Sequence, residues 1–449
     1  INPIIVNDVM KERFSRYSGN LYSRSNVDIV VDEARSYIRN SNCKYDLVQA
    51  SLVDTWASTA IGAHSLSENY LYTIEAIAEY VDHLSDNGYL TISRWHGWES
   101  YKLVILYLKA AKVLNIPNVQ KHIIVVKSLR SDQGSASIAN IIFKKSEFTN
   151  DEIKNVLDLC KSLQFEICYV PNFVGNSSEY SKIVLCENLD EKMATTWRHL
   201  RPATDDSPFF FNWVYLESVS DVLLGAASNA GIFLLYGLFF ISIFLTLTFI
   251  ILPNLLARRD IQIRGNITYL LYFSILGLSF MMVESSLLQK FMIFLGHPVY
   301  STTVIISTIL LFAGIGSLLS NRFHEDRLFQ LLKKVVIITT GIMILYDFSL
   351  YPLFNSLLGL NINARILISI ILLSGLGIFM GMPFPLGIRI LGSKNRTIIP
   401  FCWALNGAFS VLGSIVAVIL SMNTGFTQTI LFAASLYFVA YLIIARAAT

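Results

Sequence analysis

The stretch ATDDSPFFFNW, Ala203 to Trp213, joins two parts of the chain that differ in composition. Most charged residues lie before Arg201, and long apolar runs lie after Asn229. The division predicts a soluble α/β domain over residues 1–200, an elbow and linker over 201–229, and a transmembrane helical domain over 230–449.

Within this stretch, Pro208 is expected to prevent a helix. Phe209–Phe211 and Trp213 predict an aromatic belt at the depth of the lipid headgroups, and Asp205 and Asp206 are expected to remain in water. On this interpretation the stretch is an elbow that docks against the membrane. The alternative is that the two aspartates cover a pocket and attract a cationic substrate.

The composition excludes several classes of protein. The chain is 53% hydrophobic, 15% charged and carries a net charge of +3, which is too small for a nucleic-acid-binding protein of this size. The five cysteines show no C-x-x-C spacing, so the sequence predicts neither a zinc site nor a disulfide framework. The lipid bilayer is the expected partner.

Seven segments are long and apolar enough to cross about 30 Å of hydrocarbon. Small residues in FAGIGSLL and LSGLGIFMG would let helices approach closely. Pro383 and Pro385 are expected to break or kink the fifth span, either beside a cavity or where the chain turns at the interface. The predicted spans are 230–252, 267–295, 300–319, 335–354, 366–382, 401–422 and 427–444.

Strongly polar residues inside a span are costly, and each therefore needs an explanation. Glu284 is the most central of them. It is either a cation or proton site facing the bundle interior, or a structural residue that pairs with Lys290 or bonds to a neighbouring helix. The full set is Glu284, Gln289, Lys290, Asp347 and Asn406.

Residues 1–165 alternate strand-like runs with amphipathic helical stretches, which predicts a Rossmann-like, mostly parallel α/β sheet. Ser65 and Glu68 fit a capping box, and the Asn87-Gly88 pair fits a turn. Ligands of such sheets bind at the carboxyl ends of the strands. The strand-like runs are 26–32, 44–51, 88–95 and 121–128, and the helical stretches are 67–85 and 98–114.

Seven stretches in chain order carry a resemblance to a known family: INPIIVNDV, VVDEARSYI, YDLVQASLVDTWASTAIGAHSLSENYLYT, TISRW, TDDSPFFFNW, VESSLLQKFMIFLGHPVY and GMPFPLG. The chain resembles the spermidine/spermine synthase-like integral membrane proteins, whose soluble part has the class I S-adenosylmethionine-dependent methyltransferase fold. The resemblance implies a transferase of the bacterial inner (plasma) membrane. It would use S-adenosylmethionine or decarboxylated S-adenosylmethionine to alkylate a small cationic amine, such as a polyamine, or a membrane-associated acceptor.

The family's cofactor site includes a Gly-rich loop after the first strand and an acid after the second. Asn2 follows the place of that acid, so the first strand and the loop are expected upstream of this chain. Glu33 matches the family's acid near the adenosine, although it is also suited to cap a helix N-terminus. The implied cofactor contacts are Asn2, Asp32, Glu33, Gln49 and Ser51.

Aminopropyltransferases carry an aspartate-rich segment after the fourth strand. Here Gln49 and Ala50 stand near the first expected acid and Asp54 remains, which departs from the family pattern. Asp54 and Glu68 are the candidate catalytic carboxyl groups, with Asp54 a general base, an amine anchor or simply a turn or cap residue. Arg94 and Trp95 either form a pocket wall or close the sheet. The candidate pocket residues are Trp56, His64, Tyr70, Arg94, Trp95, Asp205 and Asp206.

Two hypotheses follow, and the loop charges bear on both. The loops after the first, third and fifth spans are rich in arginine and lysine, which by the positive-inside rule places the α/β domain outside the cytoplasm. The cofactor is cytosolic, so the transferase hypothesis requires the opposite side. The second hypothesis is a transporter or scaffold with a degenerate α/β cap, in which Glu284 and the kink at Pro383 line the path. The sequence indicates no metal site and no oligomeric state.

Overall fold

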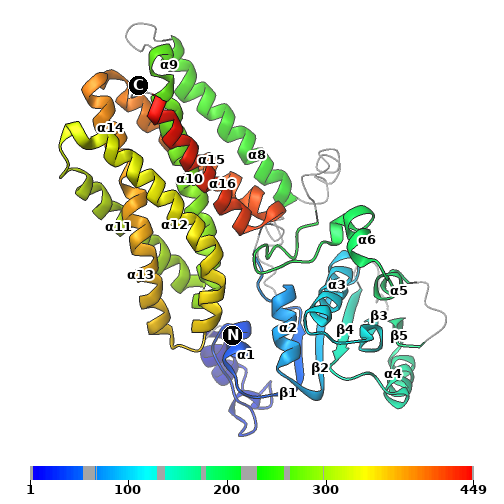
Figure 1. The fold of residues 1–449 in the computed structure, drawn as a ribbon. Helices are drawn as coiled ribbons and strands as arrows, with labels where there is room; N and C mark the ends of the chain where they lie inside the picture. The colour runs from blue at the N-terminus through cyan, green and yellow to red at the C-terminus, as the bar shows by residue number, and fades with distance from the viewer. Residues whose placement is uncertain are drawn as a thin grey trace. The chain divides into compact units, whose positions relative to one another are not determined.

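The computed structural model describes residues 4–53, 66, 68–128, 137–172, 178–213, 230–256, 263–296 and 298–446. The chain forms two compact units (Figure 1). The first, called here the α/β unit, comprises Ile1–Val53 and Asn69–Ala194. The second, called here the helical unit, comprises Asp54–Glu68 and Thr195–Thr449, so the elbow belongs to it.

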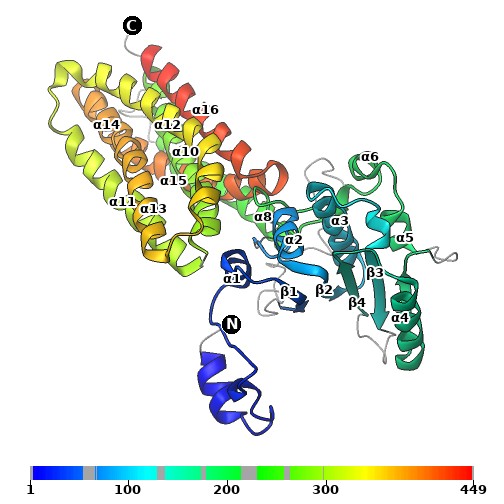
Figure 2. The same cartoon turned by 60° about the horizontal axis from the view of Figure 1, so that its bottom comes forward.

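The α/β unit contains a mixed sheet of five strands in the order β1-β2-β4-β3-β5. Figure 2 shows β1, β2, β4 and β3 in this order across the sheet. The strands are β1 Tyr45–Ser51, β2 Leu84–Trp95, β3 Ile123–Ser128, β4 Ile138–Lys144 and β5 Phe165–Tyr169. The main helices are α1 Ala34–Asn40, α2 Ile74–Asp82, α3 Trp98–Val113, α4 Asn150–Leu163, α5 Glu179–Val184 and α6 Leu189–Thr195, and a π-helix covers Ile5–Arg13.

The pairing of the strands corrects the predicted mostly parallel sheet. β1 and β2 are parallel, but the pairs β2–β4, β4–β3 and β3–β5 are antiparallel. Residues 129–137 between β3 and β4 are fewer than the dozen that a parallel crossover requires, so β4 returns antiparallel. The coarser prediction, an α/β domain with a sheet, is confirmed.

Three of the four predicted strands form, and three local predictions are wrong. The run 26–32 lies in no strand. α2 begins at Ile74, where the Thr73 hydroxyl accepts a hydrogen bond from the Ala76 amide at 3.1 Å, so this helix does not begin at the predicted capping box, whose Ser65 lies outside the described residues. Asn87 and Gly88 lie inside β2, where the register with β1 shifts, rather than in a turn.

Helices cover both faces of the sheet because side chains alternate along each strand. On one face, Phe143 of β4 meets Tyr107 of α3 at a ring-centroid distance of 5.7 Å. On the other face, Ile124 of β3 packs in a cluster with Ile153 of α4 and with Ile142 of β4. The middle strands β2, β4 and β3 are therefore the buried centre of the α/β unit, whereas β1 at the edge of the sheet is largely exposed.

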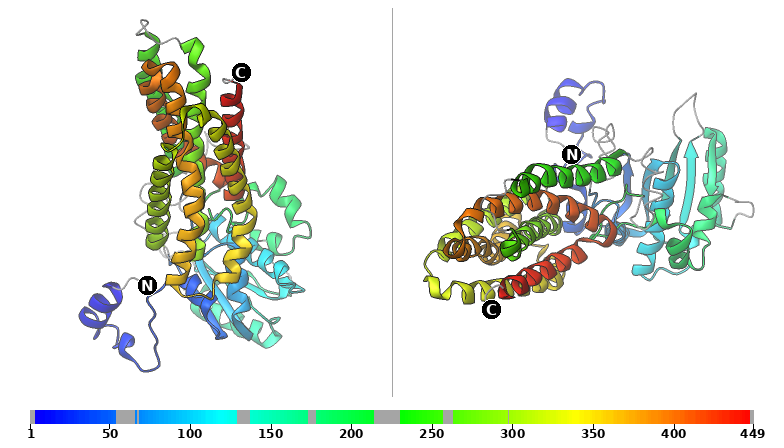
Figure 3. Two further views of the ribbon diagram at one scale, coloured as in Figure 1. Left: turned by 60° about the vertical axis from the view of Figure 1, so that its left-hand side comes forward. Right: turned by 90° about the horizontal axis from the view of Figure 1, so that it is seen from above.

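The helical unit contains seven helices that are long and apolar enough to cross a membrane, as predicted. Figure 3 shows its long helices running side by side. Among the described residues the spans are Gly231–Ile251, Asn266–Leu295, Val299–Ser320, Leu328–Leu357, Ile362–Lys394, Arg396–Thr424 and Phe426–Arg446. They are built from α8 Ala230–Leu245, a π-helix over Thr246–Ile251, α10 Ile263–Leu295, α11 Pro298–Ser320, α12 Leu328–Leu357, α13 Ile362–Gly381, α14 Pro383–Lys394, α15 Ile399–Thr424 and α16 Phe426–Arg446, with the short α9 Leu252–Leu256 after the first.

Small residues bring α11 and α13 into close contact, as the glycine-rich stretches predict. A Cβ atom added to Gly316 would lie 2.0 Å from the carbonyl oxygen of Ile378, and one added to Gly381 would lie 2.1 Å from that of Ala313. The fifth span breaks between Gly381 and Pro383, which begins α14. The predicted proline break is confirmed, and the bundle depends on backbone-to-backbone packing.

Candidate functional site

The carboxyl ends of β1 and β2 lie side by side, as expected for a parallel pair. Ser51 is in register with Ser93, and the side-chain amide of Gln49 donates to the Ser51 hydroxyl at 3.1 Å. Both Gln49 and Ser51 are exposed. This edge therefore keeps two predicted cofactor contacts accessible. The predicted site residues Asn2, Asp54, Trp56 and His64 lie outside the described residues.

Arg94 is a buried residue with partners in its own unit. Its guanidinium donates to the Glu99 carboxylate at 2.6 and 3.0 Å and lies 5.0 Å from the centroid of the Tyr72 ring. These contacts tie β2 to the start of α3 and to the segment before α2. Trp95, the last residue of β2, is half-buried. The geometry of Arg94 matches the interpretation that it closes the sheet.

Glu33 caps the N-terminus of α1. Its carboxylate accepts hydrogen bonds from the amides of Arg35 at 3.1 Å and Ser36 at 2.7 Å. The Glu33 side chain therefore caps a helix, which the sequence analysis gave as the alternative to binding adenosine. The cap also places Arg35 against α2.

Glu79 of α2 forms ion pairs with two arginines. The sequence did not single it out as a site residue. Arg35 donates to it at 2.8 Å, and Arg39 also pairs with it. Burial opposes the ionised form, but the hydrogen bonds and charges of Arg35 and then Arg39 outweigh it and lower the pKa of Glu79. Arg35 further donates to the carbonyl of Tyr70 at 3.0 Å, which fixes the predicted pocket residue Tyr70 by its backbone.

Glu68 is the candidate catalytic carboxyl group that the structure describes. Burial raises its pKa, and a hydrogen bond to its own backbone opposes that shift in part. A carboxyl group whose pKa is raised toward neutrality is suited to exchange protons.

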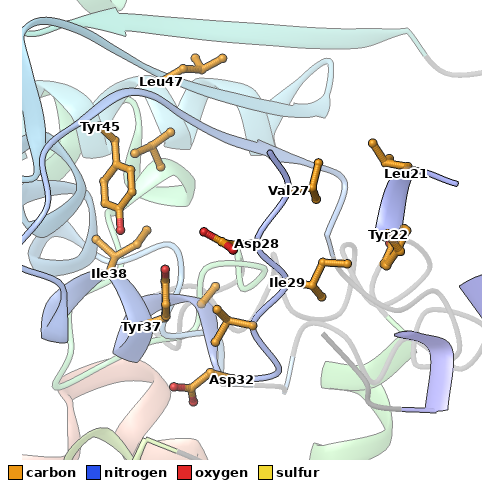
Figure 4. Close-up of a pocket in the computed structure, with 13 residues that line it drawn as sticks. Leu21, Tyr22, Val27, Asp28, Ile29, Asp32, Tyr37, Ile38, Tyr45 and Leu47 are labelled. Carbon is orange, nitrogen blue, oxygen red and sulfur yellow. The ribbon is translucent and has the colours of Figure 1, made fainter. Parts of the chain in front are cut away.

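A pocket of about 490 Å³ lies beside β1 in the α/β unit (Figure 4). Asp28 and Asp32 are the charged residues of its lining, and Figure 4 shows the Asp28 carboxylate between Tyr37 and Val27. The hydrogen bond with Tyr45 is the main reason that the pKa of the Tyr37 phenol is raised, and the Asp28 charge adds to the effect. The lining is Leu21, Tyr22, Val27, Asp28, Ile29, Val30, Asp32, Ala34, Tyr37, Ile38, Tyr45, Leu47 and Val48.

The pocket contains one of the predicted cofactor contacts, Asp32. It adjoins the first half of β1, whereas Gln49 and Ser51 lie farther along the strand. Its walls are formed by residues 21–32 and the start of β1. The sequence predicted no contact between these two segments. Among the described residues, no group of three His, Cys, Asp or Glu side chains is placed to hold a metal ion.

The elbow docks within the helical unit, but differently from the prediction. Thr204 and Ser207 form a bridge around a turn at Asp205 and Asp206, and the Ser207 hydroxyl donates to the Ser421 carbonyl at 3.1 Å. Asp205 is buried rather than in water. The elbow forms no helix, as Pro208 predicts.

The aromatic residues of the elbow are also placed differently from the prediction. Phe209, Phe210 and Phe211 are each at most 2% exposed, so they lie inside the protein rather than among headgroups. Phe209 packs against Phe426 at the start of α16, at a ring-centroid distance of 6.0 Å. Trp213 packs partly buried against the same cluster. Burial in a protein core removes more aromatic surface from water than a membrane interface does.

The polar residues of the spans have different environments. The side-chain amide of Asn406 on α15 donates to the Phe273 carbonyl on α10 at 3.0 Å, which joins two helices. Glu284 and Gln289 are half-buried on α10. Within the described part of the chain, Glu284 makes no hydrogen bond or ion pair. The suggested pair of Glu284 with Lys290 is wrong, because six positions along a helix place the two on different faces and Lys290 bonds elsewhere.

Lys290 of α10 joins residues from two helices and the elbow. Its ammonium donates to the Asp347 carboxylate of α12 at 2.9 Å and to the Thr427 hydroxyl of α16 at 2.9 Å, and lies 3.8 Å from Asp206. The Asp206 carboxylate accepts hydrogen bonds from the Thr427 hydroxyl at 2.7 Å and amide at 2.9 Å. The four residues Asp206, Thr427, Lys290 and Asp347 are called the relay cluster below.

Comparison with known proteins returns no match of this chain to a family model, to a curated protein or to a solved structure.

Proposed function

We propose that the chain is a membrane-bound transferase whose α/β unit binds an S-adenosylmethionine-type donor. The group transferred is aminopropyl or methyl, and the acceptor is a small cationic amine or a membrane-associated molecule. The observation that carries the proposal is the pocket beside β1, with apolar walls and two aspartates. The resemblance in sequence to the spermidine/spermine synthase-like membrane proteins supports the choice of donor.

The chemistry of the pocket suits such a donor. Its volume of about 490 Å³ lies in the range of small-molecule sites, roughly 300 to 1,000 Å³. Apolar side chains such as Ile29, Ile38 and Leu47 can cover an adenine ring. The carboxylates of Asp28 and Asp32 can accept hydrogen bonds from ribose hydroxyls and attract a positively charged sulfonium or amine.

Transfer to an amine also requires a group that accepts a proton. Glu68 is the described candidate carboxyl group for this step, because burial raises its pKa, but it belongs to the helical unit and is not a residue of the pocket. Because the donor is cytosolic, the proposal requires the α/β unit on the cytoplasmic side of the bacterial inner membrane, which is opposite to the side that the loop charges predict for seven spans.

Calorimetric titration of the full chain in detergent tests the proposal. S-adenosylmethionine and its decarboxylated form are titrated separately. We expect one of them to bind, and we expect Asp32→Asn to weaken binding at least about tenfold because a charge-assisted hydrogen bond is lost. Asp46→Asn is the matched control, since Asp46 is exposed on β1 and bonds to Ser85 outside the pocket. Absence of binding by the wild-type chain, or equal affinity in Asp32→Asn, would overturn the assignment.

A further inference from the structure

The relay cluster connects a partly exposed carboxylate to a fully buried one inside the helical unit. The side chain of Asp206 is 40% exposed, that of Lys290 is 14% exposed and that of Asp347 is 0% exposed. Three hydrogen bonds of 2.7, 2.9 and 2.9 Å run from Asp206 through Thr427 and Lys290 to Asp347. The chain of hydrogen bonds has no gap along this route.

The cluster contains two carboxylates and one ammonium, so it lacks one positive charge. The charged groups that face Asp347 are Lys290 from α10 and Asp206 from the elbow, while α16 contributes the Thr427 hydroxyl. Asp206 is in contact with water and with the N-terminal amide of Thr427, both of which stabilise its charge. The unbalanced charge therefore falls mainly on Asp347.

The buried carboxylate also has an oxygen without a partner. Oδ1 of Asp347 accepts from Lys290, whereas Oδ2 is buried and has no hydrogen-bond partner among the described residues. An ionised oxygen left in an apolar interior costs much more than a neutral hydroxyl in the same place. The site is thus built to accept one more positive charge next to Asp347.

We propose that Asp347 is a proton-binding site of the helical unit and that Thr427 and Lys290 connect it to Asp206. Uptake begins when the Lys290 ammonium gives a proton to the Asp347 carboxylate. The neutral Lys290 amine then takes the hydroxyl proton of Thr427. Protonated Asp206 gives its proton to the Thr427 oxygen, and Asp206 takes up a new proton from the solvent. The sum is one proton moved from water to Asp347, with Lys290 again an ammonium.

A metal ion fits this place less well than a proton. A proton needs one acceptor oxygen, while hard cations take about six or more oxygen ligands. Lys290 already occupies the position between the two carboxylates. The function is independent of the transferase proposed for the α/β unit, and it gives the seven helices a role beyond anchoring.

Infrared titration of the full chain in lipid nanodiscs tests the site. Among the carbonyl bands of the 32 Asp and Glu side chains, we expect one that forms reversibly in the wild type as the pH falls and is missing in Asp347→Asn. Glu284→Gln is the matched control, because Glu284 is another carboxyl group of the spans and lies outside the cluster. A band that persists unchanged in Asp347→Asn, or that disappears in Glu284→Gln instead, would overturn the proposal.

Two further variants test the connection and also serve if Asp347→Asn does not fold. Lys290→Met should raise the pH at which half of the band has formed by about one to three units, because an opposite charge no longer favours the carboxylate. Thr427→Val should slow proton uptake after a pH jump at least about tenfold, whereas Thr427→Ser should not. An unchanged half-formation pH in Lys290→Met would contradict the site, and equal rates in the two Thr427 variants would contradict the route.

The nature of the bound charge is tested with the same band. The titration is repeated in sodium chloride and in choline chloride at equal ionic strength. The proposal predicts the same half-formation pH in both salts. A half-formation pH that falls as sodium rises would show that a metal cation competes for the site and would overturn the assignment to a proton.

Discussion

One ion pair of the α/β unit and one of the helical unit differ in how fully their carboxylates are hydrogen-bonded. In the α/β unit, Lys144 donates to both oxygens of Glu152 at 2.7 and 2.9 Å, and Tyr89 and Thr149 donate to the same carboxylate. In the helical unit, Asp347 has one oxygen bonded to Lys290 and the other without a partner. The first pair is saturated with hydrogen bonds, and the second is not.

The number of hydrogen bonds to each carboxylate indicates the role to which its ion pair is suited. A saturated carboxylate gains nothing from a proton, so the pair with Lys144 is suited to hold β4 against the start of α4. An unsaturated buried carboxylate gains from a proton, and ionisable residues inside spans commonly belong to ion or proton pathways. The contrast can be tested by removing one partner from each pair.

The largest effect is expected from Lys290→Met. At pH 8 this change leaves Asp347 buried without its cation, and we expect a loss of about 3 to 5 kcal/mol in the free energy of unfolding. The loss should shrink as the pH falls, since a proton on Asp347 replaces the missing charge. Chemical unfolding of the full chain in mixed detergent micelles between pH 5 and pH 8 measures both. A loss that does not depend on pH would contradict proton uptake by Asp347.

A smaller effect, which also shrinks as the pH falls but in a more acidic range, is expected from Glu152→Gln. Burial opposes ionisation of Glu152, but the hydrogen bonds from Lys144, Thr149 and Tyr89 outweigh it and lower the pKa from 4.5 to about 2. Because the folded pKa is depressed, this stabilisation is present above about pH 4.5 and is lost as the pH falls toward 2. We expect Glu152→Gln to cost about 1 to 3 kcal/mol at pH 7.

Acid unfolding of the α/β unit within the full chain measures the Glu152 effect. The wild type and Glu152→Gln should converge in stability as the pH approaches 2. Asp151→Asn is the matched control, since Asp151 lies next to Glu152 in the first turn of α4 and is exposed. Curves that run parallel down to pH 2 would show that the carboxylate contributes no pH-dependent stability.

The smallest effect is expected at Asp206. Its backbone carbonyl accepts from the Phe426 amide at 2.8 Å and its carboxylate accepts from the Thr427 amide, so it caps α16 from outside the helix. Asp206→Ala should cost about 1 kcal/mol, and Asp206→Asn should cost less because an acceptor oxygen remains. Thermal unfolding compares the two variants, and equal losses would mean that the side-chain cap adds no stability.

The helical spans were predictable because length and apolarity are local properties of the sequence. All seven spans, the proline break and the close approach through Gly316 and Gly381 follow from short stretches. The sheet was less predictable, since β-branched residues form a strand only where a partner strand is available. The run 26–32 lacks such a pairing among the described residues, while β4 and β5 were not predicted.

The candidate sites were less predictable than the fold. Polarity inside a span singled out Lys290 and Asp347, but nothing in the sequence connects residues 57 positions apart. Thr427 was missed because a hydroxyl near the end of a span is common. The aspartates of the elbow were recognised as unusual, yet the burial of Asp205 and the place of Asp206 at the start of α16 depend on tertiary packing.

The most direct test of the contrast is the unfolding free energy of Asp347→Asn beside that of Lys290→Met at pH 8. Asparagine resembles a protonated aspartate, and Lys290 keeps Thr427 and Asp206 as partners. Our account predicts a loss of at most about 2 kcal/mol for Asp347→Asn, clearly below the loss of about 3 to 5 kcal/mol for Lys290→Met. Equal losses would show that the ion pair is purely structural and that Asp347 is not built to be neutral.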